Sequence, residues 1–134
     1  MRLGDTIVYR DDALEILKKI KGKLIQCITT NGTLVAQTKK LERSHIGELV
    51  DHIYISQVVG YEKPDTRFFA KVFEDLDASK DEIMIIGDSL SSDMRGGIDS
   101  GIITCFYDPN DKGTDLAIDH HIKDLHEVLD IIDI

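Results

Sequence analysis

The chain has 134 residues, of which 42% are hydrophobic and 31% charged, so it suits one domain with one core and not a disordered segment. Its formal net charge of -9 argues against nucleic acid or an anionic membrane as a partner, because both attract basic surfaces. No apolar run approaches the roughly 20 residues that cross a bilayer, no signal peptide opens the chain, and the two cysteines form no disulfide pattern. We therefore expect a cytoplasmic protein.

Helical and extended patterns alternate along the chain. The helical segments carry apolar residues three or four apart, and the extended segments are short, nearly continuous apolar runs bounded by turn residues. We expect helices at about residues 11–20, 33–43, 64–76, 91–100 and 123–132, and strands at about 23–30, 52–56, 82–87, 102–107 and 118–122. This order predicts a single α/β domain over 1–134, with a Rossmann-like parallel sheet and helices on both faces. Ligands of such folds bind beyond the carboxyl ends of the strands.

Three polar clusters follow the predicted strands. The first is TTNG at 29–32, where a hydroxyl, an amide and a glycine turn could hold phosphate oxygens. The second is GYEKPD at 60–65, which places Lys63 just before a helix N-terminus, a position that attracts anions. Taken singly, the first also fits an ordinary polar turn and the second a solvated loop.

The third cluster, IGDSLSSD at 86–93, is the most informative. Asp88 and Asp93 flank a strand-to-helix turn, and Mg²⁺ prefers a few carboxylate oxygens supplemented by water and phosphate. Helix capping by Asp88 or Ser89 is the structural alternative. Capping does not explain Gly96-Gly97 inside the helix, which we expect to allow close packing on the sheet.

Together, in this order and spacing, the clusters resemble the haloacid dehalogenase (HAD) superfamily of phosphohydrolases. ITTNG is similar to its second motif, EKPD to its lysine motif and IGDSLSSD to its acidic fourth motif. The stretches VVGYEKPDTRFF and IGDSLSSDMRGGIDSG are most similar to the cytoplasmic 5'-nucleotidase branch, which includes pyrimidine nucleotidases. The sugar-phosphate phosphatase and mutase branch is the next most similar.

The resemblance implies a role for each matching residue. Thr30 would donate a hydrogen bond to a phosphoryl oxygen, and Asn31 would help to bind that group. Lys63 would neutralise charge on the phosphoryl group. Asp88 would coordinate Mg²⁺, and Asp93 would support the metal or orient Lys63. A lysine and a metal would also create a local positive site on this acidic protein.

One motif of the family is missing. Its first motif requires an apolar strand followed by Asp-x-Asp, in which the first aspartate is the nucleophile and the second a general acid and base. Asp5 is a poor match, since no apolar strand precedes it and Ile7 stands two positions later. The chain therefore resembles the C-terminal part of the core, without the cap domain and without the central first strand.

A missing central strand would leave two unpaired edges inside the sheet. Either Thr6–Tyr9, a short β-branched run, enters the gap, or a second chain fills it by strand exchange in a homodimer.

The functional expectation is the truncated C-terminal portion of a Mg²⁺-dependent phosphatase for nucleoside monophosphates or similar small phosphate esters. Without the nucleophile, this chain alone should be inactive. The alternative is a non-catalytic remnant that binds phosphate or a partner protein, and an in-frame Asp-x-Asp strand encoded upstream would favour the enzyme. A phosphorelay receiver domain fits poorly, because there the paired acids precede the lysine.

Overall fold

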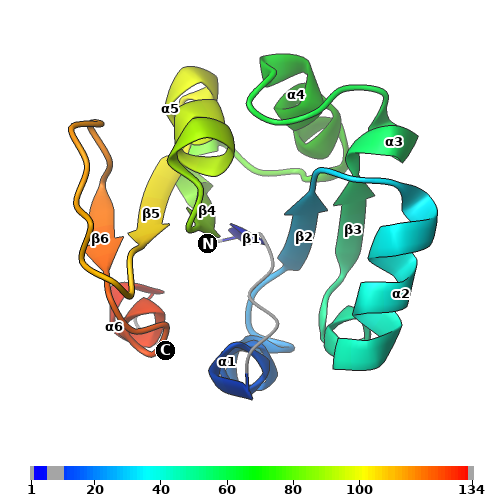
Figure 1. Ribbon diagram of the computed structural model, residues 1–134, viewed down its shortest axis with the longest axis horizontal. Coiled ribbons are helices and arrows are strands. Elements are labelled where there is room, and N and C mark those ends of the chain that lie inside the picture. The colour runs from blue at the N-terminus through cyan, green and yellow to red at the C-terminus, as the bar shows by residue number, and fades with distance from the viewer. Residues whose placement is uncertain (1, 6–10, 133–134) are drawn as a thin grey trace.

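The computed structural model describes residues 2–5 and 11–132, with side chains from residue 14 onward. In this part of the chain, parallel strands form one sheet with the order β3-β2-β1-β4-β5-β6 (Figure 1). The strands are β1 (Arg2–Asp5), β2 (Gln26–Thr30), β3 (His52–Ile55), β4 (Ile83–Gly87), β5 (Ile103–Tyr107) and β6 (His120–Ile122). The predicted Rossmann-like α/β class is confirmed.

Helices connect the strands, as the alternating pattern predicts. They are α1 (Asp11–Ile20), α2 (Leu34–Ser44), α3 (Ser56–Val59), α4 (Thr66–Asp75), α5 (Arg95–Ser100) and α6 (Glu127–Ile132), with a π-helical turn at Leu90–Met94 directly before α5. The sequence missed α3, which has a single turn and no apolar period of its own. None of the helices in the described residues has the length and apolar character needed to cross a membrane.

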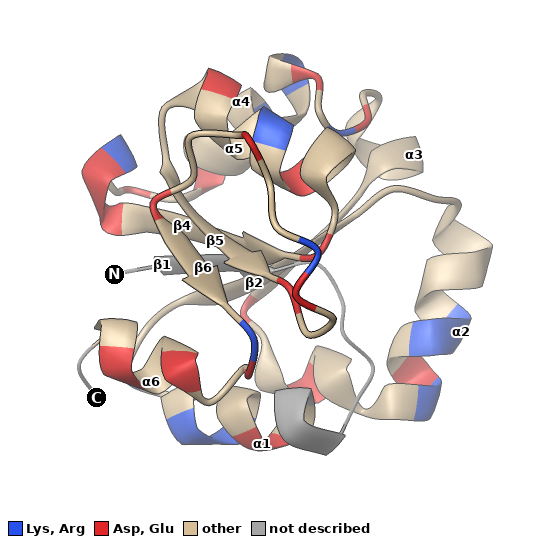
Figure 2. Ribbon diagram, turned by 60° about the vertical axis from the view of Figure 1, so that its left-hand side comes forward, with Lys and Arg blue, Asp and Glu red and all other residues tan. Residues whose placement is uncertain are grey.

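The two faces of the sheet are covered by different helices (Figure 2). Along β4, Met84 and Ile86 face a layer that includes Ile20 of α1, whereas Ile85 packs in the opposite layer with Phe68 of α4. Every residue of β2 and β4 is buried. β4 is accordingly a continuous apolar run, whereas β2 also buries the polar residues Gln26, Thr29 and Thr30. Strands β2 to β6 accordingly contain no Lys, Arg, Asp or Glu (Figure 2).

The two helical glycines allow close packing, as expected. A Cβ at Gly97 would lie 2.7 Å from Cγ2 of Ile85 and 2.8 Å from Cγ2 of Thr104. A Cβ at Gly96 would lie 2.4 Å from the ring of Phe69. The helix after the third cluster is thereby held directly against β4, β5 and α4, and this contact fixes the position of the preceding turn.

The prediction of a missing central strand is wrong for this chain. The short strand β1 lies between β2 and β4, with Gly4 level with Cys27 on one side and with Ile85 on the other (Figure 1). The gap is therefore filled from within the chain, and no second chain is needed to pair its edges. The proposed alternative segment, Thr6–Tyr9, lies outside the described residues. Pairing of otherwise exposed backbone groups on both neighbours explains why so polar a segment, RLGD, occupies a central position.

Candidate phosphate and metal site

The three polar clusters meet at the carboxyl edge of the sheet. Asn31 follows β2, Lys63 lies in the loop between α3 and α4, and Asp93 lies in the turn after β4. Hydrogen bonds join all three segments, although the residues lie about thirty positions apart in sequence. The sequence prediction that these clusters share one site is consistent with this geometry.

Lys63 is the centre of the arrangement. Its ammonium group donates a hydrogen bond of 2.5 Å to Oδ1 of Asp93 and one of 2.9 Å to the carbonyl oxygen of Thr29. The side chains of Lys63 and Asp93 are each 1% exposed. Two opposite charges so deeply buried require each other, since an ion without its partner loses hydration with no replacement. The lysine is thus fixed at the end of β2 and is not a solvated loop residue.

Asn31 holds the lysine loop by its backbone. Its Oδ1 accepts a hydrogen bond of 2.9 Å from the Lys63 amide, and its Nδ2 donates one of 3.0 Å to the Lys63 carbonyl. This two-point contact assigns Asn31 a positioning role that the sequence did not indicate. Its contact with a phosphoryl group remains a prediction.

Thr30 ends β2 in a buried position. Within the described residues, its hydroxyl makes a long hydrogen bond of 3.4 Å to the Asn31 carbonyl, so the hydroxyl can reorient toward a phosphoryl oxygen. The following Gly32 has a φ of 153°, and a Cβ there would lie 2.4 Å from Nε2 of Gln37. The tight turn after Thr30 therefore requires glycine.

Asp88 directly follows β4, and its side chain is exposed. Ser89 caps the next turn, with its hydroxyl accepting a hydrogen bond of 3.2 Å from the Ser92 amide. The capping alternative is thus satisfied by Ser89, and we find no hydrogen bond of the Asp88 carboxylate to any described residue. An exposed carboxylate at the carboxyl end of a central strand suits Mg²⁺, which often takes one or two carboxylates and completes its shell with water and phosphate.

Asp93 was predicted to support either the metal or the lysine. One oxygen of its buried carboxylate accepts the Lys63 hydrogen bond, which accounts for the lysine-orienting role. In the described residues, no three His, Cys, Asp or Glu side chains gather closely enough to hold a metal ion. Direct metal ligation by Asp93 therefore stays a prediction.

The chain is similar to known proteins in sequence and in fold. The sequence profile of the family described as haloacid dehalogenase-like hydrolase matches residues 2–107. The chain belongs to this family.

Individual HAD relatives support the nucleotidase-like branch. The chain is 31% identical to the HAD-hydrolase YfnB of Bacillus subtilis, over 92% of the chain and 54% of YfnB. It is also 31% identical to the pyrimidine 5'-nucleotidase PynA of Streptococcus pneumoniae (97% of the chain, 55% of PynA) and to the ribulose-1,5-bisphosphate 5-phosphatase of Halopiger xanaduensis (90% and 55%). A magnesium-bound crystal structure of YfnB superposes with a TM-score of 0.89 at 30% identity, over 93% of the chain and 56% of YfnB. The chain spans about half the length of the curated relatives it matches.

The register of β1 bears on the missing HAD nucleophile. Asp5 is level with Ile28 of β2 and Ile86 of β4, two residues before Thr30 and Asp88. Two residues of a strand correspond to roughly 6.6 Å. The backbone of Asp5 therefore lies short of the level at which Thr30 and Asp88 stand at the ends of their strands, and the statement that Asp5 is not the nucleophile stays a prediction.

One carboxylate–histidine contact at the same edge was not predicted from the HAD resemblance. Asp108 follows β5 in a buried position, and its Oδ2 lies 2.8 Å from Nε2 of His121 on β6. Burial alone would raise the pKa of Asp108, but hydrogen bonds from the Gly113 and Lys112 amides and from His121 outweigh it and hold the pKa at about 2. The sequence DPNDKG at 108–113 is rich in typical turn residues, and it could have indicated a tight turn after β5. This pair organises the β5–β6 loop.

Proposed function

We propose that this chain carries the phosphate- and metal-binding part of a Mg²⁺-dependent HAD phosphatase for nucleoside monophosphates or similar small phosphate esters. By itself it binds phosphate and metal weakly and does not complete turnover. Its cytoplasmic location and its small phosphorylated partner are part of the same proposal. The observation that carries it is the fixed Lys63–Asp93 pair beside the carboxyl ends of β2 and β4.

Each residue has a distinct task in this proposal. Thr30 donates a hydrogen bond to one phosphoryl oxygen, and Lys63, anchored by Asp93, supplies a positive charge in a buried setting where it is poorly screened. Asp88 would hold Mg²⁺ together with water and phosphate oxygens. When bound, the metal would neutralise negative charge on the phosphoryl group. These contributions position and bind the group, but none of them is a nucleophile.

The relatives support the substrate class. One of the matched proteins is named a pyrimidine 5'-nucleotidase and another a ribulose-1,5-bisphosphate 5-phosphatase. Both names describe removal of a phosphate from carbon 5 of a sugar, so the two relatives share a sugar 5-phosphate ester as the group that is hydrolysed. We prefer a nucleotide to a sugar bisphosphate as the substrate, because the lysine motif and the acidic motif are most similar to those of the nucleotidase branch.

Two measurements test the proposal. Titration of the ¹⁵N-labelled chain with MgCl₂ and inorganic phosphate should shift the amide resonances of Thr30, Lys63 and Asp88. Asp88→Asn should weaken Mg²⁺ binding at least about tenfold, because loss of a charged ligand costs 1.4 kcal/mol or more. Asp99→Asn is the matched control, since Asp99 is an exposed acid on α5 and carries the same charge change. Equal Mg²⁺ affinity in both variants would refute the metal site.

Hydrolysis of para-nitrophenyl phosphate tests the inactivity of the chain. We expect no Mg²⁺-dependent release of para-nitrophenol above the buffer rate. Robust hydrolysis that disappears in Asp88→Asn would show that the chain supplies a nucleophile after all.

A further inference from the structure

A hollow lies beside the proposed phosphate site, on the β3 side. Its volume is about 420 Å³, and it is lined by Gly32, Thr33, Ser56, Gln57, Tyr61 and Glu62. Gly32 directly follows Asn31, and Glu62 directly precedes Lys63, so the two segments that hold the phosphate site continue into the walls of this hollow. The volume is within the range of small-molecule sites, about 300–1,000 Å³.

The floor of the hollow is preorganised by hydrogen bonds between its two segments. The Ser56 hydroxyl accepts a hydrogen bond of 2.8 Å from the Gly32 amide and donates one of 3.2 Å to the Gly32 carbonyl. Gln57 Oε1 accepts a hydrogen bond of 2.7 Å from the Leu34 amide. These contacts join α3 to the turn after β2, so a ligand would not have to order the floor of the hollow.

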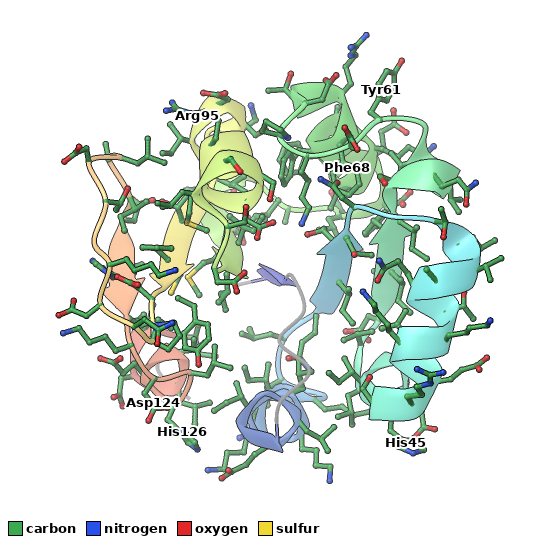
Figure 3. All side chains as sticks on the ribbon, viewed as in Figure 1. His45, Tyr61, Phe68, Arg95, Asp124 and His126 are labelled. Atoms are coloured by element: carbon green, nitrogen blue, oxygen red, sulfur yellow. The ribbon has the colours of Figure 1, made fainter. Side chains whose placement is uncertain are left out.

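Tyr61 provides an aromatic wall. Its side chain is 42% exposed and projects outward, whereas Phe68 of the following helix points to the core (Figure 3). The Arg67 guanidinium lies 4.4 Å from the Tyr61 ring centroid, and Arg67 pairs with Asp65 at 2.7 Å. The ring is thus supported by a cation that already has an anionic partner.

The charges around the hollow select the kind of ligand. Glu62 is exposed and carries a carboxylate at the wall, while the charge of Arg67 is offset by Asp65. A ligand with a second phosphate would meet this carboxylate without an uncompensated cation nearby. A neutral ligand with a planar ring and hydroxyl groups could stack on Tyr61 and donate hydrogen bonds to Glu62.

We propose that this hollow binds the leaving group of the phosphate ester and that it selects an uncharged nucleoside over a phosphorylated sugar. This inference rests on the proposed function and extends it. Part of the substrate choice then resides in the core itself, in Tyr61 and Glu62, and not in a cap alone.

Binding to the intact chain tests the assignment without requiring turnover. The ¹⁵N-labelled chain, saturated with MgCl₂ and inorganic phosphate, is titrated with uridine and separately with ribulose 1-phosphate, the leaving group of a ribulose 1,5-bisphosphate that loses its 5-phosphate. We expect uridine to bind more tightly and to shift the amide resonances of Gly32, Gln57 and Tyr61. Tyr61→Ala should weaken uridine binding about tenfold, the effect of losing one aromatic stacking contact.

Val58→Ala is the matched control, because Val58 lies on α3, is 65% exposed and does not line this hollow. It should change the uridine affinity by less than about twofold, within ordinary surface effects. Glu62→Gln should bring the affinities for ribulose 1-phosphate and uridine closer together, because it removes the negative charge that repels the phosphate of the sugar.

The two proposals fail in different ways. Tighter binding of ribulose 1-phosphate than of uridine, or equal uridine affinity in Tyr61→Ala and the unsubstituted chain, overturns the nucleoside pocket. Absence of uridine binding, while Mg²⁺ and phosphate still shift Thr30 and Lys63, overturns the pocket alone. Absence of any response to Mg²⁺ and phosphate overturns the proposed function.

Discussion

Asp93→Asn should destabilise the fold strongly, because it leaves Lys63 without its anionic partner. The two side chains are each 1% exposed and lie 2.5 Å apart, so water cannot replace the lost charge. Breaking a buried ion pair from one side typically costs 3–5 kcal/mol. The Thr29 carbonyl still accepts a hydrogen bond from Lys63, and we therefore expect the lower end, a loss of about 3 kcal/mol in the free energy of unfolding.

Urea denaturation followed by circular dichroism measures this loss. The control is Glu15→Gln, which removes a carboxylate that contacts Lys19 at 3.1 Å and His126 at 3.2 Å, with all three side chains about half exposed. An exposed pair of this kind contributes about 0.3–0.5 kcal/mol. The double variant Lys63→Met/Asp93→Leu should be more stable than Asp93→Leu alone, since it buries no unpaired charge.

A loss below about 1 kcal/mol for Asp93→Asn, similar to that for Glu15→Gln, would refute this reasoning. It would mean that Lys63 finds an alternative partner or reaches solvent at little cost. A double variant less stable than Asp93→Leu would show instead that the lysine stem contributes packing that methionine does not replace.

Two further predictions concern packing and acid stability. Gly97→Ala should lower the free energy of unfolding by about 1–2 kcal/mol, because contacts of 2.7 Å to Ile85 and 2.8 Å to Thr104 outweigh the helix-propensity gain of about 1 kcal/mol. Thermal denaturation should detect this, whereas Gly47→Ala, whose Cβ would have 3.8 Å to its nearest neighbours, should change stability by less than about 1 kcal/mol. Asp108→Asn should lower stability at pH 6 but have a smaller effect at pH 3: the folded pKa is about 2 and the unfolded value about 3.9, so the carboxylate stabilises the fold above pH 4 and loses this effect as the pH falls toward 2. The urea midpoints of Asp108→Asn and of the unsubstituted chain at pH 6, 4 and 3 test this. A difference between the two midpoints that does not shrink as the pH falls would contradict it.

The candidate site shows which parts of a prediction depend on local patterns. Asp88 could be singled out because an apolar strand, a glycine and a capping serine are adjacent in sequence. The sequence could not decide the partner of Asp93 in this way. Its distance along the chain from Asp88 is compatible both with supporting the metal ion and with orienting Lys63. Asn31 was expected to contact phosphate, but its side-chain contacts with the Lys63 backbone depend on how a separate loop packs.

The central strand shows the same limit. RLGD has one leucine, a glycine and two charged residues, and its local propensity for a strand is low. Its position is decided by the edges of β2 and β4, whose backbone groups need partners once those strands are buried on both faces. Such a tertiary requirement is not visible in a short window of sequence.

The sequence by itself therefore determined the order and type of most elements, the parallel α/β class and the three motifs of the site, because apolar period, turn residues and capping act over a few neighbouring positions. Only the tertiary structure decided that Lys63 pairs with Asp93, that Asn31 holds the lysine loop and that Arg2–Asp5 completes the sheet. These contacts join segments tens of residues apart, and their energies come from burial and strand pairing that exist only once the chain is folded.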